Sequence, residues 1–191
     1  MDFRLFRLIN GLAGHTPFLD QLMLLIVSDY VGPTLQALGL LGFWFEGADP
    51  ETRQANQRAV LRAIGALLLS GLIVALSNLV YFRPRPFTDH EVNVLFYYPS
   101  DSSFPSNSAA AVFSLATAIW LQDRRWGGML LGLAAWFALA RVYVGVHYPS
   151  DVLAGAALGA GAAWLLTRKA RRLTALFDRA IVLARWLNLG G

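Results

Sequence analysis

Residues 105–167 read PSNSAAAVFSLATAIWLQ (105–122), DRR, WGGMLLGLAAWFALARVYV (126–144), GVHY and PSDVLAGAALGAGAAWLLT (149–167). Each of the three long segments approaches the roughly 20 apolar residues with which a helix crosses the hydrocarbon core of a bilayer. The polar connections between them hold only three and four residues. Apolar segments joined this closely predict consecutive membrane-spanning helices that run antiparallel.

Two more apolar segments precede this stretch. Residues 59–82 form one expected span after a polar loop at 46–57. Residues 18–45 carry Asp29 and Pro33, so they form either one kinked span or a surface segment that leads into a shorter span. The expected fold class is therefore all-α, a polytopic transmembrane bundle of five or six spans.

The composition agrees with a membrane protein. Of the 191 residues, 56% are hydrophobic and 15% are charged, and the mean hydropathy is +0.48. These values lie outside the range of ordinary water-soluble domains. The absence of cysteine from the sequence excludes disulfide scaffolds and thiolate metal sites. A single membrane-embedded domain over residues 1–191 is expected.

Amphipathic helices are expected at both ends of the bundle, which covers residues 18–167. Residues 1–17 are too short and too charged to span, which is typical of an interfacial helix. Residues 168–191 begin with a basic run and continue with apolar side chains on one helical face, so they are expected on the membrane surface. The Gly155-x3-Gly159 spacing predicts close approach of another helix to the last span.

The basic residues predict the orientation, because cytoplasmic loops carry more of them. If five spans alternate, one side receives eleven cations: Arg53, Arg58, Arg62, Arg124, Arg125, Arg168, Lys169, Arg171, Arg172, Arg179 and Arg185. The other side receives five: Arg4, Arg7, Arg83, Arg85 and Arg141. The loop at 83–104 and the turn at 145–148 therefore both face outward and are expected to meet.

Two of the polar clusters on that outer face suit an anion. In Arg83-Pro84-Arg85-Pro86 the prolines favour an extended chain and the arginines offer forked donors to phosphate, although a charged membrane boundary explains them as well. In residues 103–108, Pro105 fits the first turn of a helix, which would leave the N–H groups of Ser106 and Asn107 free for an anion. An ordinary capped helix start is the alternative.

The third cluster carries the sharpest signal. Arg141, His147 and Asp151 lie within eleven residues, at the junction of the last two spans. Asp151, four residues after His147, is expected to accept a hydrogen bond from one imidazole nitrogen and to leave the other as a nucleophile. A lone histidine at a membrane surface is unremarkable, but these three residues beside two anion-type clusters indicate phosphate chemistry.

These residues resemble the type 2 phosphatidic acid phosphatases, whose signature is K-x6-R-P, P-S-G-H and S-R-x5-H-x3-D. The matching stretches are Asn78-x6-Arg85-Pro86, Pro105-Ser106-Asn107-Ser108 and Ala140-Arg141-x5-His147-x3-Asp151. The resemblance extends over roughly residues 60–165, and it is greatest to the bacterial undecaprenyl-diphosphatase branch.

The resemblance implies a role for each matching residue. His147 would attack the terminal phosphorus and form a phosphohistidine, while Asp151 orients its ring. The phosphoryl oxygens would be held by Arg85, Arg141, Ser106 and the backbone of Asn107. Asn78 stands at the position of the signature lysine, and Arg83 would compensate for the cation that is lost there. No metal or other cofactor is implied, because the arginines supply the positive charge.

The largest departure from the signature is Ser108, which stands where the family has the histidine that protonates the leaving group. A serine cannot supply that proton at neutral pH. Two explanations are open. The chain is a variant that traps substrate or quiets the enzyme, which we favour, or the natural protein works slowly or not at all without this acid. Asn78 and Ala140 replace the lysine and the serine of the signature.

The resemblance thus predicts a multi-pass phosphatase of the bacterial inner membrane that converts undecaprenyl diphosphate to undecaprenyl phosphate on the outer face. Its expected partners are the bilayer and a polyprenyl diphosphate; no nucleic acid is expected, and the sequence does not define an oligomeric state. A phosphatase for phosphatidylglycerophosphate, phosphatidate or diacylglycerol diphosphate is the alternative within the family. A catalytically silent lipid-diphosphate binder is the alternative outside enzymes. The apolar segments argue against a soluble haloperoxidase with the same signature.

Overall fold

The computed structural model describes residues 1–28 and 30–186, and this part of the chain is helical without strands. Asp29, considered above as a break in an apolar segment, lies outside the described residues, as do residues 187–191 at the end of the expected surface helix. The helices are α1 (Asp2–Asn10), α2 (Pro17–Val27), α3 (Val31–Phe45), α4 (Pro50–Val80), α5 (Pro86–Asp89), α6 (Asn107–Gln122), α7 (Arg124–Tyr143) and α8 (Pro149–Trp186).

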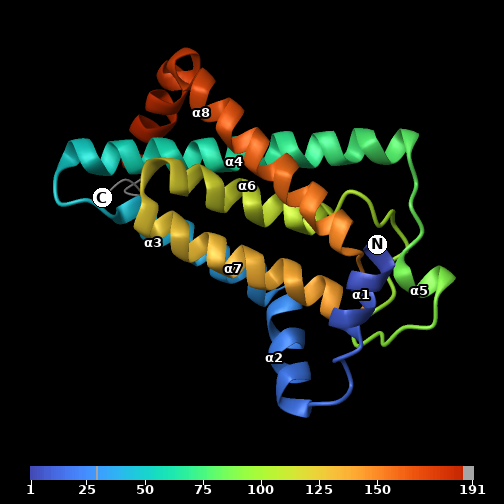
Figure 1. Ribbon diagram of the computed structural model, residues 1–191. Coiled ribbons are helices and arrows are strands. Elements are labelled where there is room, and N and C mark those ends of the chain that lie inside the picture. The colour runs from blue at the N-terminus through green and yellow to red at the C-terminus, as the bar shows by residue number, and fades with distance from the viewer. Residues whose placement is uncertain (29, 187–191) are drawn as a thin grey trace.

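Helix α6 lies at the centre of the bundle and packs against α4, α7 and α8 (Figure 1). Its contact with α8 depends on two glycines. A Cβ atom added at Gly155 would lie 2.3 Å from the carbonyl oxygen of Ser106, and one added at Gly159 would lie 2.2 Å from that of Ala110. The close approach predicted from the glycine spacing is therefore present, and α6 is the helix that it admits.

Three helices are long and apolar enough to cross a membrane within the described residues, namely α4, α7 and the first 21 residues of α8. Helices α2 and α3 pass the same test as a pair, bent by 56°, which makes four spans if the pair counts as one. The five expected spans included residues 105–122. Helix α6 has only 16 residues there, about 24 Å at 1.5 Å per residue, which is shorter than a typical hydrocarbon core.

Two expected boundaries are wrong. Residues 50–57 were expected in a loop, but α4 begins at Pro50 because the Asp49 carboxylate caps it by accepting from the Thr52 N–H at 2.9 Å. The segment after 167 was expected as a separate surface helix, but α8 continues through it to Trp186. There Asp178 pairs with Arg58 of α4 at 2.7 Å, so this part of α8 contacts the bundle.

The polar segments gather at one end of the bundle. Helices α1 and α5 lie there, beside the carboxyl ends of α4 and α7 and the start of α8 (Figure 1). A backbone hydrogen bond joins the loop at 83–104 to the end of α7, since the N–H of Leu95 donates to the carbonyl of Val144 at 3.2 Å. A second one closes the loop on itself, from the N–H of Ser103 to the carbonyl of Arg83 at 2.9 Å. The expected meeting of the two outer segments is therefore observed.

The glycine contact yields a stability prediction. We expect Gly159→Ala to lower the melting temperature of the detergent-purified protein by about 5 °C or more, because overpacking against backbone costs about 1–3 kcal/mol. Gly161→Ala is the matched control, since a Cβ at Gly161 meets nothing within 4 Å, and it should leave the melting temperature unchanged or slightly higher. Equal melting temperatures of the two variants would contradict the proposed packing.

Candidate active site

The imidazole of His147 is buried in the turn between α7 and α8, with 2% of the residue exposed. Its Nδ1 lies 2.9 Å from the carbonyl oxygen of Ser103 and 3.4 Å from the hydroxyl of the same residue. The carbonyl can only accept, and the hydroxyl donates its own hydrogen to Asp151. The proton of the neutral ring therefore sits on Nδ1, and Nε2 carries the lone pair.

The surroundings of Nε2 agree with that assignment. Nη1 of Arg85 lies 3.3 Å from Nε2 and the hydroxyl of Ser106 lies 3.4 Å from it. A guanidinium can only donate, so the nitrogen that it faces must be an acceptor. The lone pair of Nε2 is thus held next to a guanidinium and a hydroxyl, two groups that can donate hydrogen bonds to an anion.

Burial lowers the pKa of His147 to about 4. The nearby Asp151 carboxylate opposes this shift, and the positive charges of Arg141 and Arg85 reinforce it. The imidazole is consequently neutral at pH 7, which is the form that can attack phosphorus.

Asp151 does not contact the His147 ring directly. Its Oδ2 lies 3.8 Å from Nδ1, too far for a hydrogen bond. This oxygen instead accepts from the Ser103 hydroxyl at 2.5 Å and the Tyr148 N–H at 2.9 Å. The prediction of a direct Asp–His hydrogen bond is therefore wrong. Ser103 lies between the two side chains, and its carbonyl accepts the hydrogen bond from the Nδ1–H of His147.

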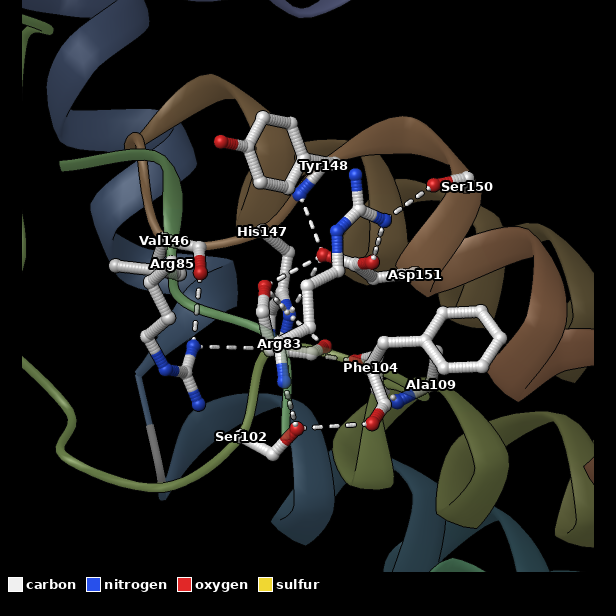
Figure 2. A network of polar contacts seen from close by, with 12 residues as sticks. Arg83, Arg85, Ser102, Phe104, Ala109, Val146, His147, Tyr148, Ser150 and Asp151 are labelled. Atoms are coloured by element: carbon white, nitrogen blue, oxygen red, sulfur yellow. Dashed lines mark hydrogen bonds and ion pairs between the residues drawn. The ribbon is translucent and has the colours of Figure 1, made fainter. Parts of the chain in front are cut away.

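Arg85 is fixed by three groups in addition to His147. It donates to the carbonyl of Val146 at 2.8 Å and to the carbonyl and carboxylate of Asp101 at 3.1 and 2.7 Å. Only 4% of Arg85 is exposed, and Figure 2 shows its guanidinium directed toward the turn at Val146. The fork is thereby oriented before any substrate binds, which suits a phosphate-binding residue.

Arg83 has a different environment from the one expected of a substitute for the signature lysine. Its Nη1 contacts Asp151 at 2.5 Å and the Ser150 hydroxyl at 2.7 Å (Figure 2). Its Nη2 contacts Asp2 at 2.8 Å. Both terminal nitrogens thus face protein partners. Asn78, the residue that stands at the lysine position of the signature, is exposed near the end of α4.

The start of α6 differs from the prediction. Pro105 was expected in the first turn of this helix, but it lies outside it, and Ser106 is the residue that caps the helix. The Ser106 hydroxyl accepts from the Ala109 N–H at 3.4 Å, and the Ser106 N–H donates to the carbonyl of Asp151 at 3.0 Å. This N–H is therefore not free for an anion as expected, because the tertiary contact with α8 uses it.

The remaining expected residues lie around this centre. Arg141, in the last turn of α7, is 4% exposed, and its guanidinium lies 5.7 Å from the ring centre of Phe96. Asn107 is the first residue of α6 and is exposed. Ser108 is partly buried and lines a cavity of about 390 Å³ between α3, α4, α6 and α7. The structure therefore gathers most of the predicted site at one end of the bundle.

Sequence reasoning missed Asp2, Asp101, Ser103 and Ser150 as site residues. Ser103 and Ser150 adjoin the recognised clusters, so the pattern of hydroxyls was an available signal. Asp2 gave none, because it meets Arg83 across 81 positions of sequence. Among the described residues, no group of three His, Asp or Glu side chains is placed to hold a metal ion.

Comparisons with known proteins agree with these motifs. A model of the PAP2 superfamily matches residues 59–175. The chain is 34% identical to undecaprenyl-diphosphatase BcrC of Bacillus subtilis over 155 aligned residues. The alignment covers 80% of this chain and 76% of that protein. The crystal structure of Aquifex aeolicus LpxE superposes with a TM-score of 0.69 at 28% identity, covering 87% of this chain and 94% of that one.

A second crystal structure shares the fold. It is that of a PAP2-type phosphatidylglycerolphosphate phosphatase from Bacillus subtilis, with a TM-score of 0.58 and 21% identity, covering 90% of this chain and 87% of that one. The helical bundle is thus shared with a solved membrane phosphatase of this type. The chain therefore belongs to the PAP2 superfamily.

Proposed function

We propose that this PAP2 phosphatase removes the terminal phosphate of a polyprenyl diphosphate, such as undecaprenyl diphosphate, through a phosphohistidine at Nε2 of His147. The observation that carries the proposal is the neutral Nε2 lone pair between Arg85 and Ser106. The 34% identity to an undecaprenyl-diphosphatase supports the choice of substrate.

The reaction has two displacements. Nε2 of His147 attacks the terminal phosphorus, the bond to the bridging oxygen breaks, and polyprenyl phosphate leaves with the electron pair. Water then attacks the phosphohistidine, the P–N bond breaks, and inorganic phosphate leaves. Arg85, Arg141 and Ser106 would stabilise the charge on the phosphoryl oxygens, which is the main requirement of phosphoryl transfer.

The buried Asp151 supports the first displacement. When Nε2 bonds to phosphorus, the imidazole gains positive charge, and its Nδ1–H stays hydrogen-bonded to the carbonyl of Ser103. The carboxylate, 3.8 Å from Nδ1, stabilises that charge through space. Asp151 would therefore act electrostatically as well as through Ser103.

The cavity beside Ser108 supports a substrate with a long apolar tail. Its other lining residues are almost all apolar: Pro33, Gln36, Ala37, Leu67, Ala111, Val112, Leu115 and Phe137. A neighbouring cavity of about 340 Å³ shares Ala37, Leu67 and Leu115 with it. The two cavities therefore adjoin, and the first of them reaches Ser108, where the leaving group would depart.

A diphosphate substrate also fits the loss of that acid. The leaving group is a phosphate monoester, whose conjugate acid is much stronger than an alcohol, so its departure requires less protonation than departure of an alkoxide. The second displacement still lacks a base for water. We infer slow turnover for the chain as it stands, on the outer face of a bacterial inner membrane as the arginine distribution favours.

Two other functions follow from specific observations. The structural likeness to a phosphatidylglycerolphosphate phosphatase makes a phospholipid phosphate the alternative substrate. Ser108 itself favours a silent lipid-diphosphate binder. Phosphate release measured in parallel from undecaprenyl diphosphate, phosphatidylglycerophosphate, phosphatidate and diacylglycerol diphosphate separates the substrates, and binding without release would support the silent protein.

We expect His147→Ala to lower phosphate release from undecaprenyl diphosphate by at least about 10³-fold, because no other group can accept the phosphoryl group at that position. The measurement is inorganic phosphate released by purified protein in detergent. His15→Ala, which removes an exposed histidine, is the control and should keep the parental rate. Parental activity in the His147 variant would exclude this residue as the nucleophile.

We expect Ser108→His to raise turnover by about 10²-fold or more, the typical contribution of a positioned acid or base. Ala111→His is the matched control, because position 111 lines the same cavity one turn further along α6. Only the first variant should gain activity in the phosphate-release assay. No gain at position 108, or an equal gain at both positions, would contradict its assignment to the acid.

The low pKa of His147 predicts that the enzyme keeps its activity to an unusually low pH. Only the neutral ring attacks, so kcat/KM of the parent should stay level down to about pH 5 and fall tenfold per pH unit below about 4. The free energy of unfolding should also decrease as the pH falls from about 6.5 to about 4. In that range the histidine of the unfolded chain, with a pKa of about 6.5, is protonated while the folded one is still neutral. A kcat/KM limit near pH 6.5 in the parent would contradict the assignment.

A further inference from the structure

Asp2 contacts the site from the opposite end of the sequence. Its Oδ2 accepts from Nη2 of Arg83 at 2.8 Å and from the Ser150 hydroxyl at 2.5 Å, and its Oδ1 accepts from the Ser150 N–H at 3.1 Å. One carboxylate thus binds the loop at 83–104 and the first turn of α8 together.

Arg83 continues this connection to the reacting side chain. Its guanidinium lies between two carboxylates, Asp2 with a side chain 28% exposed and Asp151 with one that is fully buried. Asp151 in turn holds the Ser103 hydroxyl, and the Ser103 carbonyl holds Nδ1 of His147. An unbroken chain of polar contacts therefore runs from Asp2 to the imidazole.

Helix α1 is anchored firmly enough to present Asp2. Asn10, at its other end, is 4% exposed and donates to the carbonyls of Asn93 and Tyr143 at 2.7 and 2.8 Å. The ring of Phe6 is fully buried and lies 5.7 Å from that of Tyr148. Helix α1 is thus attached to both outer segments of the site.

We propose that Asp2 is a positioning residue for the reaction, which holds Arg83 on Asp151 and through it sets the imidazole of His147. The inference rests on the proposed function, because it assigns His147 as the nucleophile. In this proposal Arg83 binds the carboxylates of Asp2 and Asp151 and does not bind the substrate. The phosphoryl oxygens would then be bound by Arg85 and Arg141.

The test uses Asp2→Asn, which keeps the size of the side chain but removes its charge. It is made in the parent and in the Ser108→His background, so that activity is high enough to measure. We expect kcat for undecaprenyl diphosphate to fall about tenfold while KM stays within twofold, because a positioning residue affects the transition state and not the binding of the substrate. Asp2→Glu, which restores the charge, should recover part of kcat.

A double-mutant cycle tests whether Asp2 acts through Arg83. If it does, Asp2→Asn combined with Arg83→Gln should have the kcat of Arg83→Gln alone. Glu51→Gln, which removes an exposed carboxylate at the far end of α4, is the matched control and should leave kcat unchanged. Unchanged kcat in Asp2→Asn, or multiplying effects in the double variant, would overturn the proposal.

A decrease in KM on Asp2→Asn would overturn it too, since that result means that Asp2 withholds Arg83 from the substrate. Hydrogen exchange of the segment 144–151 supplies a readout that needs no turnover. We expect faster exchange there in Asp2→Asn, because the N–H groups of Tyr148 and Ser150 donate to Asp151 and Asp2. This change would support the connection even if no substrate were hydrolysed, whereas unaltered exchange would contradict it.

Discussion

The buried carboxylate of Asp151 is the constraint on which the site depends. A fully buried ionised carboxylate is stable only when charge and hydrogen bonds compensate for lost water, and removal of one partner from such a group typically costs about 3–5 kcal/mol. Asp151 obtains this compensation from Arg83, the Ser103 hydroxyl and the Tyr148 N–H. Both ends of the loop at 83–104 and the turn at 145–148 must therefore converge on the start of α8, and their convergence forms the site.

That convergence requires α6 and α8 to touch backbone to backbone. The Ser106 N–H reaches the carbonyl of Asp151 at 3.0 Å only because Gly155, one turn further along α8, lets the two helices approach. The same contact places the Ser106 hydroxyl near Nε2 of His147. The small residues of the last apolar segment thus affect the proposed site as well as the packing, since a wider helix separation would move the Ser106 hydroxyl away from Nε2 of His147.

The sequence predicted those parts of the structure that local spacing determines. Short connections and helical periodicity brought Arg141, His147 and Asp151 to one junction, and the glycine spacing indicated the close helix pair. The sequence failed where a tertiary contact decides between local alternatives. Pro105 and Ser106 are both acceptable at a helix start, and the hydrogen bond to Asp151 selects the serine. Asp2 gave no local signal, because its partner Arg83 lies far along the chain.

The carboxylate partners of the arginines bear on which of these cations would bind the proposed diphosphate. Arg83 pairs with both Asp2 and Asp151, so its single positive charge is already more than balanced. Arg85 also has a carboxylate partner, Asp101, but that side chain is 65% exposed and its attraction is weakened by water. An arriving diphosphate, more highly charged and delivered to the buried face of Arg85, would therefore compete well against Asp101 and poorly against Asp151. Burial of the carboxylate, more than the number of arginines, would thus determine which cation binds the substrate.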